Sequence, residues 1–431
     1  MSKKLLKLGY LLLAGSFFLG TACSEDDNDD NNNNNNNNGN VIKTGQITSD
    51  ETWTSDKVYQ LSGRVAVTNG ATLTIEPGTV IKAEAGQEAN SSALIIARGS
   101  MINAVGTPTE PIIFTSVADE IMPGMIQSPN LNGTFSGLWG GVIILGDAPI
   151  SVEGDATETQ IEGIPPSDPN GLYGGNNPAD NSGNFQYVSI RHGGTLIGDG
   201  NEINGLTLGG VGNQTTISHV EVVANVDDGV EWFGGTVNSS NLLVWFQGDD
   251  AFDIDYAYSG TVDNIIYIGN ANSDHALEID GPEGSLNGAF TMTNGTFVGY
   301  NEGYEIDGND TIWNGNFGEY ADFRDGAQGT LSNFYFMNFS ENSDVEIDDD
   351  ASSSNYQSGI LNFNASWEFN TSHLWDGNMT TDDIFADKSD MGGALTDLSF
   401  SSTTTSPTVG ADASAFTGWT WGDAIGALDN L

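Results

Sequence analysis

The sequence contains one cysteine, few basic residues, few histidines and little proline. Cys23 is the only cysteine among 431 residues, so no disulfide can form within the chain. Only 11 lysines and arginines stand against 59 aspartates and glutamates, which gives a formal net charge of −48. Because phosphate binding needs clustered Lys and Arg, this balance argues against nucleic acid and anionic lipid surfaces as partners. The four histidines show no zinc-binding spacing, so we expect no zinc site.

The first 23 residues have the pattern of a secretory signal. Three lysines precede an apolar run at 8–19, and small residues then lead to Cys23. A basic start, a short apolar stretch and small residues before a cleavage site are typical of a signal peptide. The run is shorter than the roughly 20 residues that cross a bilayer. We therefore predict a signal peptide over 1–22 and cleavage before Cys23.

The residues around Cys23 predict where the mature protein is held. The small residues before this cysteine resemble a bacterial lipobox, which implies covalent lipid on Cys23 and a membrane anchor. Residues 24–30 are acidic, and they resemble the export signal of surface-displayed lipoproteins of the Bacteroidota. An asparagine tract at 31–38 has no apolar side chain to bury, so we expect a disordered tether over 23–45. The expected location is the outer membrane, facing the cell exterior.

From residue 46 onward, helical periodicity is almost absent and an acidic strand motif repeats. Short β-branched and aromatic runs alternate with Gly, Asn, Asp and Ser, which indicates strands joined by turns. The repeated motifs are Asp227-Asp-Gly-Val-Glu-Trp-Phe, Asp249-Asp-Ala-Phe-Asp-Ile-Asp, Asp274-His-Ala-Leu-Glu-Ile-Asp and Glu302-Gly-Tyr-Glu-Ile-Asp. Their aligned acids Glu231, Asp253, Glu278 and Glu305 are 22, 25 and 27 residues apart. Glu346 continues the pattern, with Asp322 as a less regular member between.

This repeat predicts an all-β solenoid. Coil length drifts while strand phase stays constant, which a solenoid tolerates because insertions bulge at its turns. A propeller blade would need roughly 40 residues or more. We predict a right-handed parallel β-helix with capped ends and coils about 4.8 Å apart. Its expected parts are an N-terminal cap and first coils at 46–150, a loop insertion at 151–184, further coils at 185–400 and a C-terminal cap at 401–431.

Three segments resemble a known protein family. They are Gly70-Ala-Thr-Leu-Thr-Ile-Glu-Pro-Gly-Thr-Val-Ile-Lys, Gly106-Thr-Pro-Thr-Glu-Pro-Ile-Ile-Phe-Thr-Ser and Phe185-Gln-Tyr-Val-Ser-Ile-Arg-His-Gly-Gly. They look like recurring coils of bacterial cell-surface β-helix lipoproteins with a pectin-lyase-like fold. The resemblance implies the fold, and fold alone does not imply an activity.

The chemistry of enzymes on this fold is poorly matched. Beyond residue 90 the only lysines and arginines are Arg98, Arg191, Arg324 and Lys388. These are too few for a groove that would bind an anionic uronate. Clustered acids such as Asp249, Asp250, Asp253 and Asp255 fit a glycoside hydrolase superficially. The flanking Asn-Thr-Asp and Gly-His-Gly signatures of galacturonan hydrolases are absent. We therefore lean against an enzyme, and keep a Ca²⁺-assisted lyase or glycoside hydrolase as the alternative.

The repeated acids have three possible roles. They could cap backbone N–H groups at turns, which is the usual role of turn acids. They could bind Ca²⁺, a hard cation that takes six to eight oxygen ligands. The candidate ligands are Asp227, Asp228, Glu231, Asp249, Asp250 and Asp253. They could also flank a glycan-binding face with Trp232, Trp245 and Tyr256 as stacking platforms, although alternation should turn about half of such aromatics into the core.

The favoured function is a binding or scaffold lipoprotein for a glycan or a partner outer-membrane protein. Two further expectations concern structure. Arg191 should pair with an acid of a neighbouring coil, because buried charges need partners. The two tryptophans of Phe416-Thr-Gly-Trp-Thr-Trp should cap the last coil, because an open solenoid end invites aggregation.

Overall fold

The computed structural model describes residues 40–86, 91–195, 203–300, 304–307, 310–313, 318–372, 379–429 and 431. The predicted signal peptide, the lipidation site at Cys23 and the predicted tether up to residue 39 lie outside the described residues. The prediction that the tether extends to residue 45 is wrong, because a strand of the β-helix already begins at Val41. Within the described ranges, no helix has both the length and the apolar character needed to cross a membrane.

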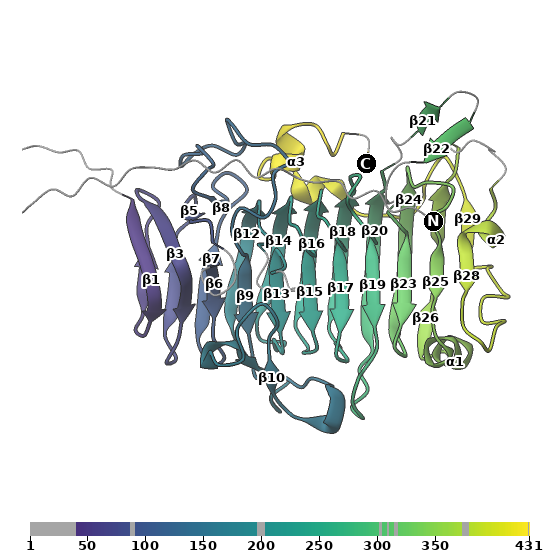
Figure 1. The fold of residues 1–431 in the computed structure, drawn as a ribbon, viewed down its shortest axis with the longest axis horizontal. Coiled ribbons are helices and arrows are strands. Elements are labelled where there is room, and N and C mark those ends of the chain that lie inside the picture. Colours follow the sequence, from purple (N-terminus) through teal and green to yellow (C-terminus); the bar gives the residue numbers. More distant parts are fainter. Residues whose placement is uncertain are drawn as a thin grey trace, which may run out of the picture. The chain divides into compact units, whose positions relative to one another are not determined.

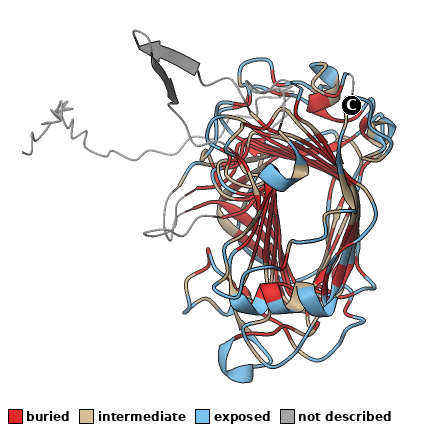
Figure 2. Cartoon of the chain, turned by 90° about the vertical axis from the view of Figure 1, so that its right-hand side faces the viewer, coloured by how far each residue is buried: buried red, intermediate tan, exposed pale blue. Residues whose placement is uncertain are grey.

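The chain folds into a parallel β-helix, as predicted. One sheet of 25 strands dominates, and its strands pair in parallel with the strands of the neighbouring coils (Figure 1). The strands stack in three columns, which we call the first, second and third stacks. Viewed from the end, buried residues line the inside of the coils (Figure 2).

The first and second stacks are separate near the N-terminus and then merge. The first stack begins with β2 (Glu51–Trp53), β4 (Thr72–Ile75) and β7 (Met101–Val105). The second begins with the N-terminal halves of β1 (Val41–Ile47) and β3 (Val58–Val67), followed by β5 (Val80–Ala83) and β8 (Ile112–Ser116). Long strands then serve both stacks: β12 (Gly183–Arg191), β14 (Thr216–Val223), β16 (Asn238–Trp245), β18 (Thr261–Ile268), β20 (Phe290–Val298) and β24 (Gly329–Met337). The last coils contribute β26 (Leu361–Phe363), β27 (Trp367–Asn370) and β29 (Ser401–Thr403).

The third stack consists of short strands. It starts with the C-terminal halves of β1 (Val41–Ile47) and β3 (Val58–Val67). It continues through β6 (Ala93–Ile96), β9 (Val142–Leu145), β13 (Leu206–Gly209), β15 (Val230–Phe233), β17 (Phe252–Asp255), β19 (Leu277–Asp280), β23 (Ala321–Arg324), β25 (Val345–Ile347) and β28 (Phe385–Asp387).

The remaining elements are short and lie between or after the coils. They are β10 (Thr159–Gln160), β11 (Leu172–Tyr173), β21 (Tyr304–Asp307), β22 (Asp310–Trp313), α1 (Asp350–Ser358), α2 (Thr381–Ile384), α3 (Trp421–Ala424) and 3-10 turns at Glu153–Asp155, Pro169–Gly171 and Ala413–Phe416. Between β9 and β12 the chain leaves the coils and forms the antiparallel β10–β11 pair.

Asparagines make the bend between the first and second stacks. Asn241, Asn264, Asn294 and Asn333 occupy equivalent places in four long strands, with φ between +56° and +60°. Asparagine tolerates this left-handed conformation because its short polar side chain bonds locally. The side chains bond along the column: the Nδ2 of Asn264 donates to the Oδ1 of Asn241 at 2.6 Å.

Aromatic rings stack between coils in the interior. Phe297, Phe336 and Phe369 occupy paired positions on three successive strands. Their ring centroids lie 4.7 and 4.9 Å apart, and the rings are nearly parallel. Stacked rings add to the area they bury, so this column stabilises the C-terminal coils.

The predicted repeat is confirmed for three coils and wrong for the fourth. Glu231 pairs with Asp253, and Asp253 with Glu278, as the 22- and 25-residue spacings predict. The next partner of Glu278 is Asp322. Glu305 lies instead in β21, which pairs only with β22 in an antiparallel hairpin among the described residues. A similar Glu-Ile-Asp motif therefore occurs in an excursion that leaves the parallel sheet.

The C-terminal tail does not cap the last coil with its tryptophans. Trp419 and Trp421 pack against Val223, Leu243 and Trp245 on the outer side of the second stack, many coils before the end. These outward apolar residues would otherwise face water, so the tail covers them. The prediction that these tryptophans cap the last coil is therefore wrong. The tail from Phe416 to Trp421 folds back along the outside of the β-helix, and we call it the tail strap.

Arg191 forms the buried ion pair that we expected. Its Nη2 lies 3.8 Å from Oε2 of Glu221 on the next strand, and both side chains are fully buried. Glu221 also accepts the backbone N–H groups of Trp421 and Gly422, at 3.0 and 2.8 Å. This one carboxylate therefore joins two coils to the tail strap.

Candidate functional site

A column of acids runs along the outer face of the third stack. Equivalent positions on β15, β17, β19, β23 and β25 carry Glu231, Asp253, Glu278, Asp322 and Glu346, which we call the acid ladder. Successive coils are about 4.8 Å apart, so each carboxylate has a like charge as its neighbour. Thr207 precedes the ladder and Ala386 follows it, so the acids end at both sides.

Side chains from the turns before these strands widen the column into a groove. Asp228, Asp250 and His275 each stand three residues before their ladder residue, at the turn that leads into the strand. The resulting acidic groove has a volume of about 460 Å³. It is lined by Glu162, Asp227, Asp228, Glu231, Asp249, Asp250, Asp253, Asp274, His275, Glu278 and Arg324. The structure thus brings all six predicted metal-ligating residues together.

Three buried carboxyl groups of the acidic groove are crowded together. Asp228, Glu231 and Asp253 are only 6%, 5% and 8% exposed. Burial raises the pKa of each group well above its usual range, and the neighbouring carboxylates raise it further. A buried charge is costly unless it is paired, so these groups need a proton or a cation.

Few hydrogen bonds compensate this burial. Oδ1 of Asp228 accepts the backbone N–H of Asp250 at 2.9 Å, and Oε2 of Glu231 accepts Nδ2 of Asn204. Oδ1 of Asp253 has no hydrogen-bond partner. One oxygen atom of each of the three carboxylates lies within 4.8 Å of the other two. These carboxylates are therefore close together and poorly satisfied.

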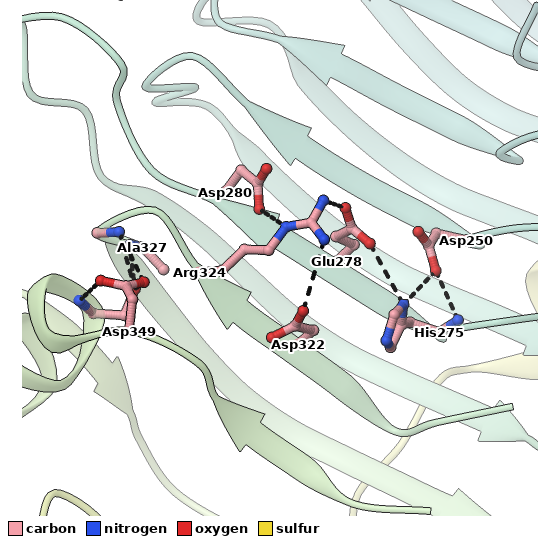
Figure 3. A network of polar contacts seen from close by, with 10 residues as sticks. Asp250, His275, Glu278, Asp280, Asp322, Arg324, Ala327 and Asp349 are labelled. Atoms are coloured by element: carbon pink, nitrogen blue, oxygen red, sulfur yellow. Dashed lines mark hydrogen bonds and ion pairs between the residues drawn. The ribbon is translucent and has the colours of Figure 1, made fainter. Parts of the chain in front are cut away.

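Cations compensate the next part of the ladder. Arg324 contacts Glu278, and its Nε lies 2.7 Å from Asp280 while its Nη1 lies 3.9 Å from Asp322 (Figure 3). Nδ1 of His275 lies 2.8 Å from Oδ1 of Asp250. Burial lowers the pKa of His275, but the hydrogen bond and charge of Asp250 outweigh it and raise the pKa to about 9. This histidine is therefore cationic at neutral pH.

At the C-terminal end of the ladder, a lysine is the cation that compensates the acids. Glu319, Asp344 and Glu346 bring carboxylate oxygens within 4.8 Å of one another. Nζ of Lys388 contacts Glu346 and lies 3.7 Å from Asp344. Its side chain is 45% exposed, so solvent screens this contact more than those deeper in the groove.

Comparison with known proteins places this architecture in a family. Residues 45–422 match a family model described as a pectate-lyase-like beta helix domain. The chain belongs to this family. No match was found among curated proteins or among solved structures. The family match agrees with the parallel sheet described above.

Two predicted stacking platforms of this pectate-lyase-like β-helix are wrong. Trp232 points into the interior beside Phe252 and Tyr258, with ring centroids 6.5 and 5.7 Å away. It must do so because its neighbour Glu231 faces outward and side chains alternate along a strand. Trp245 is buried under Trp421 of the tail strap. Neither tryptophan can stack on a sugar.

Tyr256 remains a prediction as a ligand-binding residue. It is partly buried and packs against Phe233, with ring centroids 5.8 Å apart. It follows Asp255 directly, beyond the end of β17. Its ring is therefore near the acids but is partly used in packing.

Six residues of the site were not among the predicted site residues: Glu162, Asn204, Asp274, His275, Glu278 and Arg324. Asn204 donates to Glu231, and its Oδ1 is buried without a partner. It stands three residues before Thr207, the spacing of Asp228 to Glu231, which is a signal that could have identified it. Glu162 reaches the groove from the 151–184 insertion, and its position could not be read from the coil repeat.

A hard cation fits the donor set of this pectate-lyase-like domain. The deepest ligand atoms are carboxylate oxygens with an amide oxygen nearby, and Ca²⁺ takes six to eight such ligands. No cysteine is present beyond Cys23, so thiolate-binding metals are poorly matched.

Proposed function

We propose that this protein is a lipid-anchored binding module of the outer membrane, facing the cell exterior, whose acidic groove holds a glycan. Covalent lipid on Cys23 supplies the anchor. A partner outer-membrane protein is the other ligand class to be tested.

The observation that carries this proposal is the lining of the acidic groove. Nine of its eleven lining residues are Asp or Glu, and the other two are His275 and Arg324. Ionised carboxylates only accept hydrogen bonds, whereas glycan hydroxyl groups donate them readily. The groove volume of about 460 Å³ is within the usual range for small-ligand sites. These features support binding of neutral sugar units over binding of anions.

Binding is better supported than catalysis because the closest acids are inaccessible. A glycosidase needs two carboxyl groups on either side of the scissile bond. Glu231 and Asp253 are more than nine-tenths buried and bring carboxylate oxygens within 4.8 Å of each other, which leaves no room for a sugar between them. They are therefore poor candidates for acid and nucleophile.

One observation favours the enzyme alternative. Burial and the nearby Glu162 raise the pKa of Asp255 to about 7. A carboxyl group with such a pKa can act as a general acid near neutral pH. A Ca²⁺-assisted polysaccharide lyase or hydrolase is therefore the second candidate.

A glycan screen of the full-length protein in detergent separates the two functions. We expect binding to one or more neutral glycans without product release. Asp249→Asn, at the exposed rim of the groove, should weaken binding, whereas Asp263→Asn on the first stack should not. Product release that is lost in Asp255→Asn would overturn the binding proposal in favour of an enzyme. Binding of no glycan, together with co-purification of one outer-membrane protein, would replace the glycan by that partner.

The anchor is tested in cells. Cys23→Ala should abolish palmitate incorporation and release the protein from the membrane fraction, because its lipid chains would be lost. Protease added to intact cells should remove the wild-type protein if it faces outward. Palmitate labelling that persists in Cys23→Ala would contradict the anchor.

A further inference from the structure

The acid ladder is compensated by side-chain cations in one part only. Arg324, Lys388 and His275 contact the ladder acids from Glu278 onward, and His275 also contacts Asp250 in the turn before β17. Among the ion pairs formed by the described residues, none involves Asp228, Glu231 or Asp253. These three carboxylates are the most deeply placed of the predicted metal ligands, together with Asp250, which His275 already pairs.

An unpartnered oxygen atom points to a missing ligand at this place. Asp253 is 8% exposed, lines the acidic groove, and leaves its Oδ1 without a hydrogen bond. An unsatisfied buried polar atom costs about 1 to 3 kcal/mol, and more when it is charged. The crowding of the three carboxylates and this orphaned oxygen are separate observations, and both are explained by one bound cation.

A neutral oxygen donor lies beside the carboxylates. The amide of Asn204 directs Nδ2 to Glu231 and leaves Oδ1 buried and unpartnered. Oxygen and nitrogen of an asparagine amide exchange places by a half-turn of the group. After that rotation Oδ1 would face the carboxylates, where a cation would hold it.

We propose that Asp228, Glu231 and Asp253 bind one Ca²⁺, with Oδ1 of Asn204 as a further ligand. Three carboxylates and an amide oxygen match the oxygen preference of Ca²⁺, and water from the groove completes its coordination. Mg²⁺ fits less well because it demands near-ideal octahedral geometry and gives up its water reluctantly. Asp227 and Asp249 lie nearer the rim, so the proposal reduces six predicted ligands to three.

The register gives this ion a structural role. Glu231 and Asp253 are paired on β15 and β17, Asp228 is in the turn before β15, and Asn204 is in the turn before β13. One ion therefore joins three successive coils from the outside. Arg324 makes the same kind of connection between β19 and β23. The proposal is independent of any glycan, because its consequence is the stability of these coils.

Calorimetric titration and thermal unfolding of the EDTA-stripped full-length protein test the site. We expect one Ca²⁺ per chain at this site and a rise in melting temperature of about 4 °C at a calcium concentration roughly one hundred times the Kd. Mg²⁺ should give a smaller shift. Asp253→Asn and Glu231→Gln should each lose the calcium response, and Asn204→Ala should weaken the affinity.

Matched controls make each outcome decisive. Asp263→Asn removes one acid from β18, far from the groove in the coil, and should keep the full response. Asp249→Asn should also keep it. Circular dichroism checks that each variant has the same folded spectrum as the wild type. The readout is then the difference in melting temperature with and without calcium. An unchanged melting temperature in the wild type would overturn the proposal. So would a calcium response that survives Asp253→Asn and Glu231→Gln but is lost in Asp249→Asn.

Discussion

The two ends of the acid ladder share a fold but differ in what neutralises them. Glu231 and Asp253 stand on β15 and β17, while Glu278, Asp322 and Glu346 stand on β19, β23 and β25, all in one register. The later acids contact Arg324 or Lys388. The earlier two have no such contact among the described ion pairs. The β-helix therefore sets the position of the charges, and individual side chains decide their compensation.

The size of the repulsion shows why compensation is needed. Two unit charges about 4.8 Å apart repel by about 3.5 kcal/mol at an effective dielectric constant of 20. Protein stability is commonly only about 5 to 15 kcal/mol, so two uncompensated acids would cost a large share. Backbone capping alone does not remove a like-charge repulsion. The earlier acids must therefore hold protons or a metal ion, whereas the later acids can remain ionised beside arginine.

The largest expected effect is a pH dependence of the calcium-free protein. Burial and neighbouring acids raise the pKa of Glu231 and Asp253, and raise that of Asp255 to about 7. The folded state then holds protons that the unfolded state releases above about pH 4, so the free energy of unfolding falls as pH rises. The raised pKa of Asp255 alone should lower the free energy of unfolding by about 2 kcal/mol between pH 5 and pH 7. Glu231 and Asp253 should lower it further.

Urea unfolding at pH 5, 6 and 7 measures this dependence. In EDTA the midpoint should fall steadily with pH. With saturating calcium the fall should be much smaller, because the ion binds the ionised carboxylates and offsets their repulsion. A midpoint in EDTA that rises between pH 5 and pH 7 would contradict the assignment of protons to the earlier acids.

A smaller effect is expected when Arg324 is removed. Arg324→Met leaves Glu278, Asp280 and Asp322 without their cation, which should destabilise the calcium-free protein by about 2 kcal/mol. This is less than the roughly 3 to 5 kcal/mol for a fully buried pair, because the Arg324 side chain is 40% exposed. Lys57→Met, which removes an exposed charge, should change stability by less than about 0.5 kcal/mol.

Arg324→Met should also remove the difference in charge compensation between the earlier and the later acids of the ladder. Without Arg324 the later acids resemble the earlier ones, so Arg324→Met should bind an additional Ca²⁺ and gain more stability from it than the wild type. Titration calorimetry counts the ions directly. An unchanged count would mean that the later acids are neutralised by protons alone.

The parallel β-helix was predictable because its signal is periodic. The 22- and 25-residue spacings from Glu231 to Glu278 reflect whole coils, and the structure confirms them as direct strand pairs. The acids at these positions could be placed on one face for the same reason. All six predicted metal-ligating residues line one groove, although which of them bind a metal stays a proposal.

The errors arose where local sequence does not report tertiary position. Glu305 has the motif of a coil but lies in the β21–β22 hairpin. Trp232 could have been assigned to the interior, because alternation turns it away from Glu231. Trp245 faces outward and is buried only because the strap covers it. No spacing within the coils reports such a distant contact.

The smallest effect should come from Lys388 at the end of the ladder. Lys388→Met removes the contacts to Glu346 and Asp344, but the lysine side chain is 45% exposed and Ala386 ends the row of acids beside it. Solvent and salt screen such a pair, so we expect a loss of about 0.5 to 1 kcal/mol at low ionic strength and less at 1 M salt. Urea unfolding at both salt concentrations measures it. If Lys388→Met lost as much stability as Arg324→Met, the difference in solvent exposure between the middle and the end of the ladder would have no effect on stability, which would contradict this prediction.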